Sequence, residues 1–413
     1  MPILLPVTQL QPGMTLAANV TSDNAILLAY RRQITQDDID SLRDKFPHLL
    51  LQILHPILDQ NVEFQDDSRD ADTAHQVRAS VANAAQKVNA TLRSGTALTA
   101  QTLAPIQDTI HQMLQYLQDN PVNAALLEQT ATCDDYLQQH AANVFYLSML
   151  IGNTLRNYVK QERERLSSAK SLSNALNLNP LALAALLHDV GMVPLEKLYR
   201  KNAPLDPDQI AAVRQHPLKG AALLPQKVDA MVRLVIRSHH ENYCGTGYPR
   251  KLAGDRITIF ARIIRVADAY AAAIARKQYK NAKSPARALH EMTKGPYQTL
   301  YDPNILNVFA RLIQPFPIGA KLKLNSGQTA VVTKHDPRHP FAPHVIIAFD
   351  QHDKPLTQDQ LQPPFALCDQ KQLWPTQFAG EDLTFLRESP NDPPPPSPPQ
   401  PDQPTELLTL LYP

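Results

Sequence analysis

The chain has 413 residues, and its 40 lysines and arginines nearly balance its 39 aspartates and glutamates, for a formal net charge of +1. This balance argues against the chain-wide basic surface of a nucleic-acid-binding protein. The three cysteines (Cys133, Cys244 and Cys368) are too far apart for a CxxC zinc site or a disulfide framework. No signal peptide and no apolar run of the roughly 18 residues needed to span a bilayer is visible. We therefore expect a cytoplasmic protein with no membrane span and no nucleic-acid partner.

Residues 1–65 are predicted to form a small α/β accessory module. Ala25 to Tyr30 is typical of a buried strand, and Thr35 followed by Asp38 predicts a capping box that opens a helix. Residues 66–132 are rich in Ala, Gln, Asn and Leu and predict a helical connector.

From 133 to 312 the apolar residues recur at helical spacing, as in the series Val144, Leu147, Leu150 and Ile151. The period changes after this region: residues 320–324 alternate and 330–332 and 345–347 are typical strands, so residues 313–385 are expected to form a small β-module. The proline-rich segment 386–413 predicts a disordered tail, because polyproline sequences cannot bury a core. The predicted fold class is mainly α, with a small α/β module before the helices and a small β-module after them.

Histidines and carboxylates stand at the ends of apolar segments in the helical region. His188 and Asp189 follow the apolar run 181–187, where Gly191 is predicted to cap the helix, and His239 and His240 follow the run 231–236. Asp268 lies inside the apolar run 263–270, and His140 and His216 complete the candidate set.

Each of these signals alone is weak, since a histidine such as His216 before a proline is more often a surface or capping residue. A buried carboxylate is costly unless it is paired or bound to metal, so their joint occurrence on apolar helices favours a metal site. Imidazole and carboxylate ligands suit iron, manganese or zinc, and a carboxylate shared by two ions is the usual arrangement for displacement at phosphorus.

The order of these residues resembles the HD superfamily of phosphohydrolases. The string His239-His240-Glu241-Asn242-Tyr243-Cys244-Gly245-Thr246-Gly247-Tyr248-Pro249 is similar to the motif that names the HD-GYP subfamily. The resemblance extends from about residue 135 to 312 and implies an HD-type helical bundle as the core of the fold.

The resemblance also implies an activity, a metal-dependent phosphodiesterase that hydrolyses cyclic di-GMP to pGpG in bacterial second-messenger signalling. Whether pGpG is then cut to GMP stays open. His140, His188, Asp189 and Asp268 would hold one divalent ion, and Asp189, His216, His239 and His240 the other. Asp189 and His188 are the expected catalytic residues, and Lys277, Lys280 and Tyr248 the expected substrate contacts. The family favours iron or manganese, and its expected partners include signalling proteins such as diguanylate cyclases.

The chain departs from the family pattern at several positions. Met192 stands where the family usually has a lysine placed to neutralise substrate phosphate, and Cys244 and Ala271 replace customary carboxylates. Tyr136 occupies the position of the glutamate that binds a third metal, so a two-metal site is expected. Because of Met192, a receptor for cyclic di-GMP or a protein partner without turnover stays open as an alternative. A third alternative is an enzyme for another phosphoester, such as a different cyclic dinucleotide.

Overall fold

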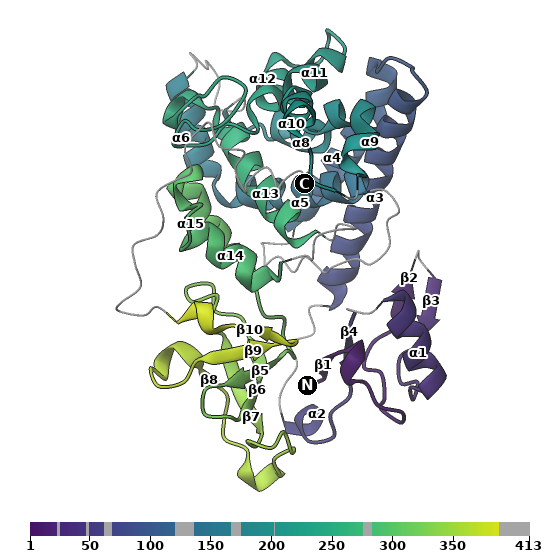
Figure 1. Ribbon diagram of the computed structural model, residues 1–413, viewed down its shortest axis with the longest axis vertical. Helices are drawn as coiled ribbons and strands as arrows, with labels where there is room; N and C mark the ends of the chain where they lie inside the picture. Colours follow the sequence, from purple (N-terminus) through teal and green to yellow (C-terminus); the bar gives the residue numbers. More distant parts are fainter. Residues whose placement is uncertain are drawn as a thin grey trace.

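The computed structural model describes residues 1–22, 25–46, 49–61, 68–119, 136–166, 175–201, 203–275 and 283–387. Figure 1 shows the long helices gathered in one half of the molecule and the short strands in the other. This confirms the mainly α fold with a small β-module. Within the described part of the chain, no helix is both long enough and apolar enough to cross a bilayer. The predicted tail lies outside the described residues from 388 onward.

The helical half is built around two helices whose side chains are almost entirely buried, α5 (Tyr136–Thr154) and α13 (Ile259–Ile274). These two helices pack against each other at the centre of the largest apolar core. The surrounding helices are α6 (Arg156–Leu166), α8 (Asn179–Leu187), α9 (Glu196–Tyr199), α10 (Pro207–Arg214), α11 (His216–Leu223), α12 (Ala230–Ser238), α14 (Pro285–Thr293) and α15 (Pro303–Leu312).

Helix α8 shows why this region folds as it does. Its sequence is apolar around its whole circumference, which is typical of a helix buried on every side, and Pro180 occupies its first turn. The helix ends at Leu187, and the prediction that Gly191 caps it is wrong. Gly191 belongs to the following 3-10 helix η2 (Val190–Leu195), where an added Cβ would collide with the backbone carbonyl of His216. The glycine is required because η2 and α11 approach each other closely.

Two further helices, α3 (Ser68–Arg93) and α4 (Ala100–Asp119), lie in the region expected to be a connector. Their apolar side chains, including Val81, Val88 and Ile106, belong to the same core as the side chains of α5 and α8. Helix α3 packs along α5, so these helices extend the helical core.

The N-terminal segment contains β1 (Ile3–Pro6), β2 (Val20–Ser22), β3 (Ala25–Leu28), α1 (Gln36–Lys45), β4 (Leu50–Ile53) and α2 (Leu58–Asn61). The predicted capping box is confirmed, because Thr35 and Asp38 exchange side-chain and backbone hydrogen bonds at the start of α1. The predicted strand at β3 is also present, but its predicted burial is wrong: Ile26 is 61% and Leu27 44% exposed. Strands β2 and β3 pair with each other as a two-stranded ribbon, which leaves these side chains in solvent.

The C-terminal segment forms one antiparallel sheet in the order β10-β9-β5-β6-β7-β8. The strands predicted near 320–324, 330–332 and 345–347 are confirmed as β5, β6 and β7. Their bounds are β5 (Lys321–Leu324), β6 (Thr329–Lys334), β7 (His344–Phe349), β8 (Phe365–Ala366), β9 (Pro375–Phe378) and β10 (Glu381–Asp382).

The N-terminal segment and the C-terminal sheet pack against each other in the strand-containing half of the molecule (Figure 1). The backbone nitrogen of Leu4 donates to the carbonyl of Gly319 over 2.8 Å. One apolar core joins Leu5 and Ile53 from the first segment to Val331 and Ile346 from the C-terminal sheet. The strand-containing half of the molecule is therefore assembled from segments on both sides of the helical region.

Candidate metal centre

Five helical elements bring the seven candidate ligands together. His140 lies on α5 and Asp268 on α13; His188 and Asp189 follow the last residue of α8; His216 begins α11; and His239 and His240 follow α12. Each of the seven side chains is at most 6% exposed. Apolar helices thus carry the polar groups into the interior, where they contact one another.

Asp189 lies between two groups of histidines. Its Oδ1 atom is 3.2 Å from Nε2 of His216 and 3.8 Å from Nε2 of His239. Its Oδ2 atom faces the opposite way, 3.4 Å from Nε2 of His188 and 3.8 Å from Nε2 of His140. One carboxylate therefore contacts both groups, each through a different oxygen.

Asp268 contacts the same cluster from α13. Its Oδ1 atom lies 3.0 Å from Nε2 of His140 and 4.0 Å from Nε2 of His188. Its Oδ2 atom lies 3.6 Å from Nδ1 of His240. The residues grouped in the sequence as two ligand sets are thus adjacent in space, with the two aspartates between the histidines.

Backbone carbonyls orient three of the histidine rings. Nδ1 of His188, His216 and His239 donates to the carbonyl three residues earlier, over 2.7–2.8 Å. Because a carbonyl only accepts, this hydrogen bond places the ring proton on Nδ1 and directs Nε2 into the cluster. Metal-binding histidines are commonly held in this way.

Burial and neighbouring charges shift the protonation of these groups in opposite directions. Burial lowers the pKa of His239 to about 4, so that ring is neutral at pH 7. Burial would also lower the pKa of His188, but the negative charges of Asp189 and Asp268 outweigh it and raise the pKa to about 9. Despite burial, the charge of His188 holds the pKa of Asp189 well below its usual range. Without an ion, the cluster binds a proton at His188.

The donor atoms fit divalent metal ions. Nε2 of His216 lies 3.2 Å from Nε2 of His239, so in neutral rings two lone pairs would face each other unless a cation lay between them. Nε2 of His188 and Oδ2 of Asp268 are buried and make no hydrogen bond among the described residues. Donors bound at about 2.0–2.2 Å to one ion lie about 3 Å apart, close to these separations. The set Asp189, His216, His239 and His240 and the set His140, His188 and Asp189 each place their donors within 4.8 Å of one another.

The segment after His240 closes over the cluster. The Tyr248 ring stacks on the His240 ring, with centroids 4.8 Å apart. The Glu241 carboxylate accepts from the backbone nitrogens of Arg250 and Leu252 and so folds the segment back on itself. Gly247 lies against the backbone of residues 240–242, where an added Cβ would collide. Tyr248 therefore lies beside the cluster, whereas the predicted substrate contacts Lys277 and Lys280 lie outside the described residues.

The structure describes the surroundings of two residues that depart from the family pattern, Met192 and Tyr136. The Met192 side chain is completely buried in the main apolar core, and its backbone nitrogen donates to the carbonyl of Asp189. The Tyr136 ring is nearly parallel to the ring of His140, with centroids 5.4 Å apart. An aromatic ring thus lies beside His140, at the position of the glutamate that binds a third metal in some family members.

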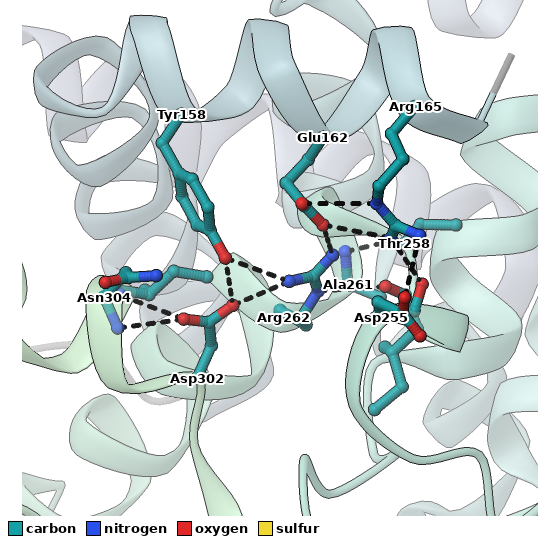
Figure 2. A network of polar contacts seen from close by, with 11 residues as sticks. Tyr158, Glu162, Arg165, Asp255, Thr258, Ala261, Arg262, Asp302 and Asn304 are labelled. Atoms are coloured by element: carbon teal, nitrogen blue, oxygen red, sulfur yellow. Dashed lines mark hydrogen bonds and ion pairs between the residues drawn. The ribbon is translucent and has the colours of Figure 1, made fainter.

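Sequence reasoning did not single out Arg262, which holds the helices around the cluster. Figure 2 shows its guanidinium between Glu162 on α6 and Asp302 at the start of α15. It also donates to the hydroxyl of Tyr158 over 3.3 Å and to the backbone carbonyl of Ile257 over 2.9 Å. A charged side chain in the largely apolar sequence of α13 was the available signal. Arg262 joins α6, α13 and α15 two turns before Asp268.

A separate group of potential ligands, Asp336, His339 and Cys368, lies in the C-terminal sheet region. The Asp336 carboxylate already accepts from Nδ1 of His339 over 3.0 Å and from the backbone nitrogen of Arg338 over 2.8 Å. His339 is more than half exposed. A hydrogen-bonded turn accounts for this group without an ion.

Comparison with known proteins agrees with this geometry. Residues 146–305 match a family described as HD domain. The chain is 30% identical over 241 residues to the cyclic di-GMP phosphodiesterase PA4108 of Pseudomonas aeruginosa, covering 57% of this chain and 54% of that protein. It is 26% identical over 212 residues to a cyclic di-GMP phosphodiesterase of Thermotoga maritima, covering 48% and 56%. It is also 32% identical over 140 residues to the 3'3'-cGAMP-specific phosphodiesterase 3 of Vibrio cholerae, covering 33% and 30%. The chain thus spans about half the length, or less, of these curated relatives.

Proposed function

We propose that this chain, whose residues 146–305 match the HD domain family, belongs to the HD-GYP subfamily and is a metal-dependent phosphodiesterase that hydrolyses cyclic di-GMP. The observation that carries the proposal is the position of Asp189, whose two oxygens contact two different histidine groups inside one buried cluster. A carboxylate shared in this way is the arrangement that two-metal phosphoester hydrolysis uses. The names of the relatives from Pseudomonas and Thermotoga support cyclic di-GMP as the substrate.

The proposed ligand assignment follows the two faces of Asp189. His140, His188 and Asp268 would hold one ion together with Oδ2 of Asp189, and His216, His239 and His240 the other together with Oδ1. Iron or manganese is proposed because mixed imidazole and carboxylate ligands suit both. When bound, the ions would supply Lewis-acid activation of the phosphodiester and of the attacking water.

The chain's own residues prepare this site. The three backbone carbonyls fix the rings of His188, His216 and His239 so that Nε2 points inward before any ion arrives. The surrounding apolar core excludes bulk water and so strengthens the electrostatic interactions within the cluster. We assign Asp189 and His188 to the reaction centre, with Tyr248 as a substrate contact.

The experiment is a product assay on purified protein loaded with manganese or iron under reducing conditions. Cyclic di-GMP should be converted to pGpG and then GMP, separated by ion-exchange chromatography. Asp189→Ala should abolish conversion, and His339→Ala, a histidine outside the cluster, should leave it at the wild-type rate. Absence of any product from metal-loaded wild-type protein would refute the proposal.

A second candidate is a cyclic di-GMP receptor without turnover, which the apolar, fully buried Met192 favours. The same sample distinguishes the two, because a receptor would bind the nucleotide in equilibrium dialysis and release it unchanged. The relative named as a 3'3'-cGAMP-specific phosphodiesterase makes 3'3'-cGAMP the comparison substrate. Preferential cleavage of 3'3'-cGAMP would show that the protein is a phosphodiesterase whose substrate is 3'3'-cGAMP and not cyclic di-GMP.

A further inference from the structure

Three polar groups close to the metal cluster are buried and make no hydrogen bond among the described residues. They are Nη1 of Arg265, Nε of Arg214 and the hydroxyl of Tyr248. A buried donor without a partner destabilises the folded protein, and the cost is larger when the group is charged. Folded proteins rarely leave such groups unsatisfied, so each requires an explanation.

The Tyr248 hydroxyl belongs to a side chain that contacts the cluster directly. The Tyr248 ring stacks on the ring of the candidate ligand His240, with centroids 4.8 Å apart. The charges of Arg265 and Arg214 act on this hydroxyl, as do those of Asp268 and Asp189. A hydroxyl at this place can donate a hydrogen bond to a group bound beside the cluster.

The two arginines lie on different helices and contact different parts of the segment after His240, Arg214 at Tyr248 and Arg265 at Asn242. The guanidinium of Arg214, the last residue of α10, lies 5.8 Å from the centre of the Tyr248 ring. Arg265 lies on α13, one turn before Asp268, and its side chain also faces the ring of Tyr301 at 5.4 Å. Arg265 is only 2% exposed.

Among the described residues, neither arginine has a carboxylate within 4.0 Å. Arg265 instead donates from Nε to the neutral Oδ1 of Asn242 over 3.0 Å. Burying a guanidinium without a counter-charge is costly. Arg262, on the same helix, has two carboxylate partners. The contrast indicates that the counter-charge of Arg265 comes from a ligand.

We propose that Arg214, Arg265 and the hydroxyl of Tyr248 form an anion pocket that binds a phosphate group of the substrate beside the metal cluster. The pocket rests on the proposed function only in that the substrate is a phosphoester. Guanidinium groups suit this task, because their fixed N–H donors match phosphate oxygens and remain charged. The pocket supplies positive charge to a site in which Met192 supplies none.

Inorganic phosphate is the probe. Its dissociation constant is measured by calorimetry on the metal-loaded full chain, together with metal content and with kcat and KM for cyclic di-GMP and for bis(p-nitrophenyl) phosphate. Arg265→Met and Arg214→Gln should each weaken phosphate binding at least tenfold and raise KM, with metal content unchanged. Arg237→Gln, which changes an exposed arginine on α12, is the matched control and should leave phosphate binding unchanged.

Asn242→Ala tests whether Arg265 acts only by positioning the segment after His240. This variant removes the hydrogen bond to Arg265 but keeps both guanidinium groups, so phosphate should bind within about threefold of the wild-type affinity. An Asn242→Ala variant that weakens phosphate binding as much as Arg265→Met would overturn the pocket and make Arg265 a positioning residue. If Arg265→Met does not fold, Arg214→Gln decides the matter, because Arg214 is only half-buried.

The outcomes separate this inference from the proposed function. Wild-type protein that binds phosphate through both arginines but cleaves neither diester would refute the enzyme and support the pocket. Wild-type protein that cleaves cyclic di-GMP, with phosphate affinity unchanged in both arginine variants, would support the enzyme and overturn the pocket.

Discussion

Nε2 of His140 lies 3.0 Å from Oδ1 of Asp268, although 128 residues separate them in the sequence. The contact joins the two central helices, α5 and α13, at the point where both deliver a candidate ligand. Because the packing of these helices fixes the contact, the cluster is held in place by the apolar core around it.

Asp189→Ala should remove both ions, because Asp189 is the residue whose two oxygens face both histidine groups. His216→Ala should remove only the ion on the Oδ1 side, which leaves about one metal ion per chain. Elemental analysis after gel filtration measures both values. Wild-type metal content in Asp189→Ala would rule out the bridging role.

Metal binding should release about one proton per chain at pH 7. His188, with its pKa raised to about 9, is protonated in the metal-free protein, whereas His239, with its pKa near 4, is already neutral. The ion must therefore displace the proton of His188, and apparent metal affinity should rise with pH until the pH approaches 9. Calorimetry in buffers of different ionisation enthalpy counts the proton; a binding enthalpy independent of the buffer would contradict the prediction.

Arg262→Ala should lower the free energy of unfolding by about 3–5 kcal/mol, because it leaves the fully buried Asp302 carboxylate without its counter-charge. Arg165→Ala is the control within the same network (Figure 2), and its effect should be small since Arg165 pairs with Glu162 and Asp255 at the surface. Urea denaturation of the metal-loaded protein measures both. Equal effects of the two substitutions on the free energy of unfolding would show that burial of Arg262 does not determine its contribution to stability.

Met192→Lys should raise turnover of cyclic di-GMP and lower the melting temperature. The ammonium would add the positive charge that the family usually has at this position, and one such group is typically worth about a hundredfold in rate. The cost in stability arises because Met192 is completely buried, so the new charge is partly removed from water. Metal content should not change. An unchanged rate with both metals bound would show that position 192 does not limit catalysis.

The sequence predicted well those features that depend on local pattern or on long motifs. The capping box at Thr35 needs only residues three apart, and the alternation in residues 320–324, which form β5, follows from a period of two. The seven candidate ligands could be named together because several motifs occur in one order, and the structure brings them into contact; their roles as ligands remain predictions.

Features set by distant neighbours were not predictable. Gly191 follows a helix and so suggested a cap, but the backbone of α11 is what requires a glycine there. The apolar run at Ile26 suggested burial, whereas burial depends on what packs over the strand. Arg214 and Arg265 are ordinary charged residues in the sequence. Only the folded chain shows that Arg214 faces the Tyr248 ring, that Arg265 binds Asn242, and that neither has a carboxylate within 4.0 Å among the residues the structure describes.

The shared core of the two end segments has a consequence for synthesis on the ribosome. Leu5 and Ile53 emerge early, but their partners Val331 and Ile346 are made almost 300 residues later. The apolar face of the first segment must therefore wait, exposed or held by a chaperone, while the whole helical region is translated. Contacts this distant in sequence form slowly and leave aggregation-prone surface open in the meantime. The yield of the full chain on expression should therefore depend more strongly on translation speed and chaperone supply than the yield of the helical region expressed by itself.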